Sequence, residues 1–186
     1  MRITKTKTPL RLLDFDIENR PLSYWYDGKA TAEVTAIAWS WVGEDVVHPR
    51  ILGWVPMETM LQDFVDAYNQ ADIVTGHYIR RHDLPILNGA LMEMGMPLLG
   101  PKMTHDTKLD LPKRAGLSMA QEALGAMYKL DAPKHHMTQS DWRDANRMTE
   151  SGFKKTRERV VSDVIQHKEL YQRLRPILKA PKLWKP

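Results

Sequence analysis

The fold is decided by the stretch Leu12-Leu13-Asp14-Phe15-Asp16-Ile17-Glu18, in which acids take every second position of an apolar run. Side chains alternate between the two faces of a β-strand, so Asp14, Asp16 and Glu18 are expected on one face and the apolar residues on the other. Three carboxylates on one face of a buried strand repel one another and lose hydration unless a cation lies among them. The stretch therefore predicts a strand that carries a metal site.

The composition indicates one globular domain. The chain has 186 residues, of which 42% are hydrophobic and 27% charged, which is enough to bury a core. It has no cysteine, so disulfides and thiolate metal ligands are excluded. No apolar run approaches the length of a membrane span. We therefore expect a single domain over residues 1–186 with no membrane partner, located in the cytoplasm, or in the host cytoplasm if a phage encodes it.

The charge distribution favours a polyanionic partner. The formal net charge is +4, and residues 151–186 alone hold ten Lys or Arg against three acids. We expect residues from about 175 to 186 to form a basic tail. Phosphates need positioning contacts from such bases, and phosphodiester hydrolysis needs a metal. The alternative is a basic helix and tail that are simply solvated.

The order of periodic segments predicts the fold class. Three strand-like segments with short connections are typical of an antiparallel meander, and helix-like and strand-like segments then alternate. This order predicts an α/β fold with a mixed sheet, antiparallel meander plus parallel strands, covered by helices. The expected strands are 10–18, 33–42, 46–54, 72–76 and 103–106, and the expected helices are 57–68, 84–94, 118–128, 140–148 and 154–174.

Two further acids are candidates for the same site. Asp83 precedes Leu84-Pro85 at the start of a predicted helix, where an acid also simply stabilises the helix dipole. Asp163 is flanked by apolar β-branched residues, which turns its helix face toward the core. Its structural alternative is a buried acid paired with a nearby arginine.

The order of these acids resembles that of the DEDD superfamily, the DnaQ-like 3'-to-5' exonucleases of RNase H-like fold. The nearest branch is that of predicted RNase H-like exonucleases from microbes and phages. The resemblance spans most of the chain and includes an Asp-Thr strand after the second motif. The matching segments are LLDFDIEN (12–19), GHYIRRHDLPIL (76–87), MTHDTK (103–108) and VVSDVIQHKELYQRLRP (160–176).

This resemblance implies the catalytic residues and the cofactor. Asp16, Glu18, Asp83 and Asp163 would hold two divalent cations, Mg or Mn, which are the ions that carboxylate oxygens suit. In such sites one ion activates the attacking water and the other neutralises the departing 3' oxygen. Asp14 stands at a position that is usually apolar in the family, so it is either an additional metal ligand or shares the role of Asp16.

One catalytic group of the family is missing. A Tyr or His usually lies one turn before the last Asp, but this chain has Glu158 and Arg159 there. One candidate base is His167, which lies four residues after Asp163 and therefore on the same helix face. Glu158 is another candidate base. The alternative for His167 is an ordinary surface or core histidine.

Substrate contacts are predicted from side-chain chemistry. Aromatic rings near the first two motifs would stack on terminal bases, although core or interface packing explains such rings equally well. Basic side chains near the last motif would hold phosphates. The predicted contact residues are Tyr24, Trp25, Tyr78, Lys154, Lys155 and Arg159.

These features predict a metal-dependent 3'-to-5' exonuclease that removes nucleoside monophosphates from single-stranded DNA ends. Such a hydrolase would act in DNA replication or repair, with a polymerase or another replication protein as partner. One alternative is an exoribonuclease of the same fold, since nothing in the sequence reads a 2'-hydroxyl. A second alternative, from another class, is a nucleic-acid-binding accessory module with weak or no catalysis.

Overall fold

The computed structural model describes residues 9–22, 30–112, 116–132 and 135–186. Its strands are β1 (Leu12–Pro21), β2 (Ala32–Trp41), β3 (His48–Ile51), β4 (Ile73–Gly76), β5 (Lys102–Asp106) and β6 (Lys182–Trp184). They form one sheet in the order β3-β2-β1-β4-β5-β6. β4 is parallel to β1 and to β5, and the other neighbouring pairs are antiparallel. The predicted meander and mixed sheet are confirmed.

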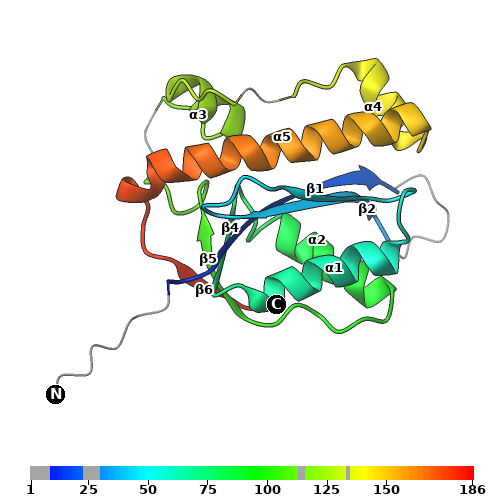
Figure 1. The fold of residues 1–186 in the computed structure, drawn as a ribbon, viewed down its shortest axis with the longest axis horizontal. Coiled ribbons are helices and arrows are strands. Elements are labelled where there is room, and N and C mark those ends of the chain that lie inside the picture. The colour runs from blue at the N-terminus through cyan, green and yellow to red at the C-terminus, as the bar shows by residue number, and fades with distance from the viewer. Residues whose placement is uncertain (1–8, 23–29, 113–115, 133–134) are drawn as a thin grey trace.

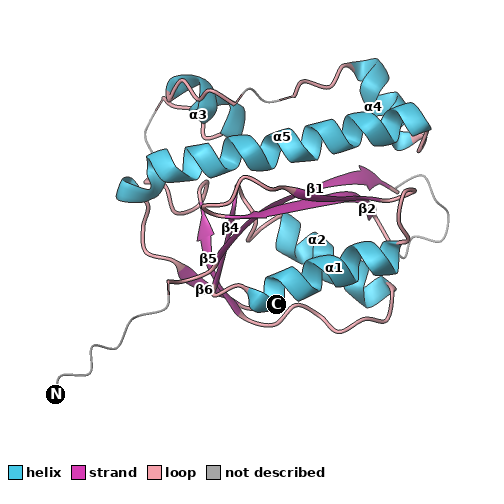
Figure 2. Ribbon diagram, in the orientation of Figure 1, coloured by secondary structure: helices cyan, strands magenta, loops and turns pink. Residues whose placement is uncertain are grey.

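Within the described residues, five α-helices cover the two faces of this sheet. They are α1 (Met57–Gln70), α2 (Asp83–Glu93), α3 (Gln121–Met127), α4 (Gln139–Asn146) and α5 (Glu150–Leu174). α1 and α2 lie on one face, and α5 crosses the other, with α3 and α4 on its outer side (Figure 1). Figure 2 shows the same layers by type of element. None of the helices in the described parts of the chain has the length and apolarity that a membrane span requires.

The alternation in β1 divides the core from the polar layer, as predicted. Leu13, Phe15 and Ile17 are at most 5% exposed and belong to the main apolar cluster, which includes residues of α1 and α2. Phe15 packs against Phe64 of α1 with ring centroids 4.9 Å apart. The acids point the other way, toward α5. β1 is therefore a central strand that builds the core with one face and presents acids with the other.

Several expected elements differ in extent; the first strand, for example, continues to Pro21 and does not end at residue 18. The strand expected over 46–54 is only β3, because a turn follows it at Gly53, where φ is +101°. A side chain on Gly53 would collide with the ring of Phe153 from α5, so this turn packs directly on the helix. α5 begins earlier than expected, because Thr149 Oγ1 accepts a hydrogen bond from the Gly152 amide at 3.0 Å and caps the helix. The expected helix 118–128 is shortened to α3.

The segment expected only as a basic tail contains regular structure. It begins with a short 3-10 helix, Arg175–Ile177, and ends in β6 at the edge of the sheet. Trp184 is 8% exposed and joins the main core. The lysines of this C-terminal segment are exposed, while the backbone of β6 pairs with β5. The segment is therefore both basic and ordered.

Candidate metal site and its cleft

Three carboxylates from distant parts of the chain converge beside β1. Asp16 and Glu18 project from β1 toward α5, and Asp163 projects from α5 toward them. One ligand oxygen from each lies within 4.8 Å of the others. Carboxylate oxygens are the hard donors that Mg and Mn prefer, and a cation among them would relieve their mutual repulsion. These three residues are therefore positioned to hold a metal ion.

Asp83, the first residue of α2, lines the same cleft, which has a volume of about 290 Å³. It is not a member of the three-carboxylate group among the described residues. Burial raises the pKa of its carboxyl to about 7, and the charges of Asp106 and Glu18 add to the rise. Backbone N–H groups of Asp83 and Ile17 donate to it and oppose this change. Asp83 is thus partly protonated near neutral pH, and a cation beside it would favour the charged form.

Arg159 lies between two of the metal-site acids. Its Nε is 3.2 Å from Glu18 Oε1 and 3.1 Å from Asp163 Oδ2. Its Nη1 donates to the carbonyl oxygen of His135 at 2.7 Å, and its side chain is 16% exposed. The pairing with Asp163 is the arginine-acid contact that the sequence offered as the structural alternative. The guanidinium partly neutralises the acids of the site.

A second wall of the cleft carries an aromatic ring and a lysine. Tyr78, in the loop after β4, has a positive φ of 75°. Lys108, after β5, places its Nζ 4.0 Å from the centroid of the Tyr78 ring. Both residues line the same cleft as the acids. A ring and an ammonium group at this spacing suit the base and phosphate of a nucleotide.

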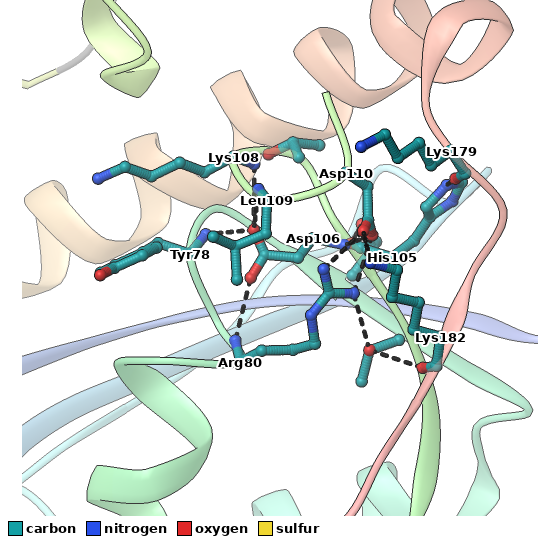
Figure 3. Close-up of polar contacts among 12 residues, drawn as sticks. Tyr78, Arg80, His105, Asp106, Lys108, Leu109, Asp110, Lys179 and Lys182 are labelled. Carbon is teal, nitrogen blue, oxygen red and sulfur yellow. Dashed lines mark hydrogen bonds and ion pairs between the residues drawn. The ribbon is translucent and has the colours of Figure 1, made fainter. Parts of the chain in front are cut away.

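The carboxylate of Asp106 holds this wall in place. Its Oδ1 accepts hydrogen bonds from the amides of Tyr78, Lys108 and Leu109, each at 3.0 Å. Its Oδ2 accepts one from the Arg80 amide, also at 3.0 Å. Figure 3 shows these contacts converging on one fully buried side chain. Asp106 therefore joins the end of β5 to the loop that leads from β4 to Asp83.

A second acid reinforces the same loop. Asp110 receives two hydrogen bonds from the Arg80 guanidinium, at 2.9 and 2.6 Å, and one from the Asp106 amide at 2.9 Å. Figure 3 shows the Arg80 amide bonded to Asp106 and the Arg80 guanidinium bonded to Asp110. The bidentate pair with Asp110 fixes the guanidinium end of Arg80. The hydrogen bond from the Arg80 amide to Asp106 fixes the backbone end of the same residue. Asp106, at the end of β5, and Asp110, four residues later, thereby hold the loop before α2 in place.

Asp14 and His167 form a separate buried pair behind the cleft. Asp14 Oδ2 is 2.6 Å from His167 Nδ1, and the two side chains are 0% and 2% exposed. His167 Nε2 is 2.9 Å from Thr107 Oγ1, which in turn is 3.0 Å from Nδ1 of His77, a residue of the cleft wall. Metal binding by Asp14 and base catalysis by His167 remain predictions, since neither residue is among those that line the cleft in the described parts of the chain.

The other predicted residues lie outside the cleft or outside the described ranges. Glu158 is 56% exposed and lies 3.7 Å from His135. Lys154 pairs with Glu150 at 3.8 Å, and Lys155 pairs with two acids of α4, which ties α4 to α5. Their roles remain predictions. Tyr24 and Trp25 lie outside the described residues.

Several cleft residues were not predicted to contribute to the site. These are His77, His82, Lys108 and Gln121. A signal for most of them was available, because they follow β4 and β5, and ligands of parallel sheets bind beyond the carboxyl ends of neighbouring strands. The sequence marks Asp106 only as part of the Asp-Thr strand, because its bonds to the β4-α2 loop depend on the tertiary structure.

Comparisons with known proteins support the fold alone. No protein-family model matches the sequence, and neither does any curated protein. Among solved structures, the chain is similar to the family B DNA polymerase of the hyperthermophilic archaeon Pyrobaculum calidifontis. The TM-score is 0.70 with 18% sequence identity, over 91% of this chain and 25% of the polymerase chain. This chain thus spans about a quarter of the polymerase, and the shared architecture is consistent with an RNase H-like fold.

Proposed function

We propose that the protein is a metal-dependent 3'-to-5' exonuclease that hydrolyses single-stranded DNA from its ends and releases nucleoside monophosphates. The observation that carries the proposal is the convergence of Asp16, Glu18 and Asp163 beside the buried Asp83 in one cleft. A module that only binds nucleic acid gains nothing from four acids beside phosphate, since they repel it. The similarity in fold to a DNA polymerase agrees with DNA as substrate.

The four acids would hold Mg or Mn, with Asp16, Glu18 and Asp163 as the ligands whose oxygens already converge. When bound, two divalent ions supply the Lewis acidity that activates water and stabilises the leaving oxygen. Asp83 completes the set in its charged form. No tyrosine or histidine stands at the family's base position, so these carboxylates carry most of the chemistry that the chain contributes.

We assign substrate binding to Tyr78, Lys108 and Arg159, which line the same cleft as the acids. Lys108 would neutralise a phosphate, and the Tyr78 ring beneath it would stack against the terminal base. The Arg159 guanidinium lies against Glu18 and Asp163 and would contact the scissile phosphate. None of these groups selects deoxyribose over ribose, so single-stranded RNA is the alternative substrate for the same site.

The test uses the full chain with a 5'-labelled single strand, as DNA and as RNA of the same sequence, in Mn or Mg. We expect a ladder of products shortened from the 3' end, stopped by EDTA and by a 3'-terminal block. Asp163→Asn, which removes a charge but keeps the shape, is expected to lower the rate about 100-fold or more. Asp72→Asn is the control, because Asp72 bonds the Arg11 amide before β4, away from the cleft. The absence of shortening on both strands with both metals would show the proposal to be wrong.

One observation favours a second candidate, a nucleic-acid-binding module without catalysis. Arg159 takes the place of the family's Tyr or His and pairs with two of the metal-site acids. A protein that had lost hydrolysis would tolerate such a cation permanently. It would bind the labelled strand equally well in EDTA and in Mn and leave its length unchanged, whereas the exonuclease shortens it.

A further inference from the structure

Arg159 contacts two of the three acids that could hold a metal ion. Its Nε lies 3.2 Å from Glu18 Oε1 and 3.1 Å from Asp163 Oδ2. Those two residues also supply two of the three oxygens that lie within 4.8 Å of one another. The guanidinium is thus the resident cation for two of the three acids that could ligate a metal.

A guanidinium and a divalent ion compete in this place. A divalent ion draws its stability from the negative charge of Glu18 and Asp163, which the guanidinium already neutralises. Two cations so close to each other in a partly buried cleft also repel strongly, because screening by water is weak there. The Arg159 side chain is only 16% exposed, so solvent does not remove this conflict.

The guanidinium has a second anchor away from the acids. Its Nη1 donates to the His135 carbonyl oxygen at 2.7 Å, and the His135 amide donates to Ser162 Oγ at 3.0 Å. This anchor keeps the end of the side chain at the cleft even when its Nε leaves the acids. Arg159 therefore keeps the His135 carbonyl oxygen as a hydrogen-bond partner when it is not paired with the acids.

We propose that Arg159 is a built-in competitor of the metal. In the metal-free protein it bridges Glu18 and Asp163, and metal loading displaces its Nε from both acids while the His135 contact holds the guanidinium at the cleft. This inference rests on the proposed function, since it takes these acids to be metal ligands. It means that Arg159 sets the metal affinity of the site and stabilises the metal-free fold.

The test compares Mn²⁺ affinity among variants of the full chain by the EPR signal of free Mn²⁺. We expect Arg159→Gln to bind Mn²⁺ about tenfold more tightly than the wild type, because a competing positive charge is gone. Arg159→Lys keeps the charge but loses the position of Nε, so its affinity should be intermediate. Arg157→Gln removes the same charge from an exposed position of α5 and should stay within about twofold of the wild type.

A second measurement covers the case in which a variant folds poorly. In the wild type, the Arg159 Nε–H resonance should lie among hydrogen-bonded signals without metal and lose that shift when Mg²⁺ is added. In EDTA, Arg159→Gln should melt at a lower temperature than the wild type and gain more from Mn²⁺. Unchanged or weaker Mn²⁺ binding by Arg159→Gln, or an Nε–H signal indifferent to Mg²⁺, would overturn the inference.

These outcomes separate the inference from the proposed function. If Arg159→Gln binds Mn²⁺ more tightly but neither protein shortens DNA or RNA, the competition stands and the exonuclease proposal fails. If the wild type degrades DNA but Arg159→Gln binds Mn²⁺ no more tightly, the exonuclease stands and the competition fails.

Discussion

The charge of Asp83 depends strongly on its surroundings. Its carboxyl is 2% exposed, and burial raises its pKa from the ordinary 3.8 to about 7. Between these two values the unfolded chain has released the proton while the folded protein still holds it. The free energy of unfolding therefore falls as the pH rises through this window, and the contribution that is complete below pH 4 is lost above pH 7.

The variant Asp83→Asn should lack this pH dependence. In EDTA, we expect the stability of the wild type to fall relative to Asp83→Asn by up to about 1.4 kcal/mol per pH unit between pH 4 and 7. Urea unfolding of both proteins across that range measures the difference. Titrating groups that do not interact with Asp83 are common to both proteins and cancel, whereas Glu18 and Asp106 interact with it and contribute to the difference. Parallel stability curves would mean that Asp83 is charged in the metal-free protein.

At the scale of elements, the loop between β4 and α2 depends on one carboxylate of β5. Asparagine at position 106 can keep the three amides on Oδ1, but its NH₂ group then faces the Arg80 amide, so two donors oppose each other. We expect Asp106→Asn to lower the hydrogen-exchange protection of the Arg80 amide about tenfold. This corresponds to a loss of roughly 1.4 kcal/mol in the free energy of local opening. NMR of exchanging amides provides the measurement.

Asp72→Asn is the matched control for this loop. It also weakens a carboxylate-to-amide bond, Asp72 to Arg11 at 2.8 Å, but before β4 rather than after it. Exchange at Arg80 should be unchanged in that variant. Equal protection of Arg80 in Asp106→Asn and the wild type would show that Asp110 alone holds the loop.

The contacts of these elements show what the sequence could predict. The alternation in β1 and the i,i+4 spacing of Arg159 and Asp163 are local patterns, so the polar face of the strand and one ion pair were predictable. The partner of Asp14 was not, because His167 lies 153 residues away. An alternating pattern shows which face an acid takes, but not which side chain meets it there.

β6 was missed for a related reason. It has only three residues, and the hydrogen bond that the Lys182 carbonyl oxygen accepts from Thr104 of β5 spans 78 positions of the sequence. Three residues are too few to display a period of two, and the lysines around them favour a solvated tail. The edge strand exists because β5 offers it unpaired backbone groups, and no local pattern records that.

At the scale of the whole molecule, metal binding by these acids would be linked to folding, because only the folded chain brings them together. Glu18 and Arg159 are 141 positions apart, and Asp163 lies one turn beyond Arg159. A ligand that binds only the folded state stabilises it by about 2.7 kcal/mol at 100 times its Kd. For a chain of this size, that corresponds to a rise in melting temperature of about 5–10 °C.

We therefore expect saturating Mn²⁺ to raise the melting temperature of the wild type by about that amount, measured by circular dichroism against an EDTA sample. Asp16→Asn removes one of the three converging carboxylates and should lose most of the rise, whereas Asp72→Asn should keep it. A rise that persists in Asp16→Asn would place the stabilising ions elsewhere on the protein. Because Arg159 already neutralises part of the site, the rise should be smaller than in Arg159→Gln, which links the metal affinity of one cleft to the stability of the entire fold.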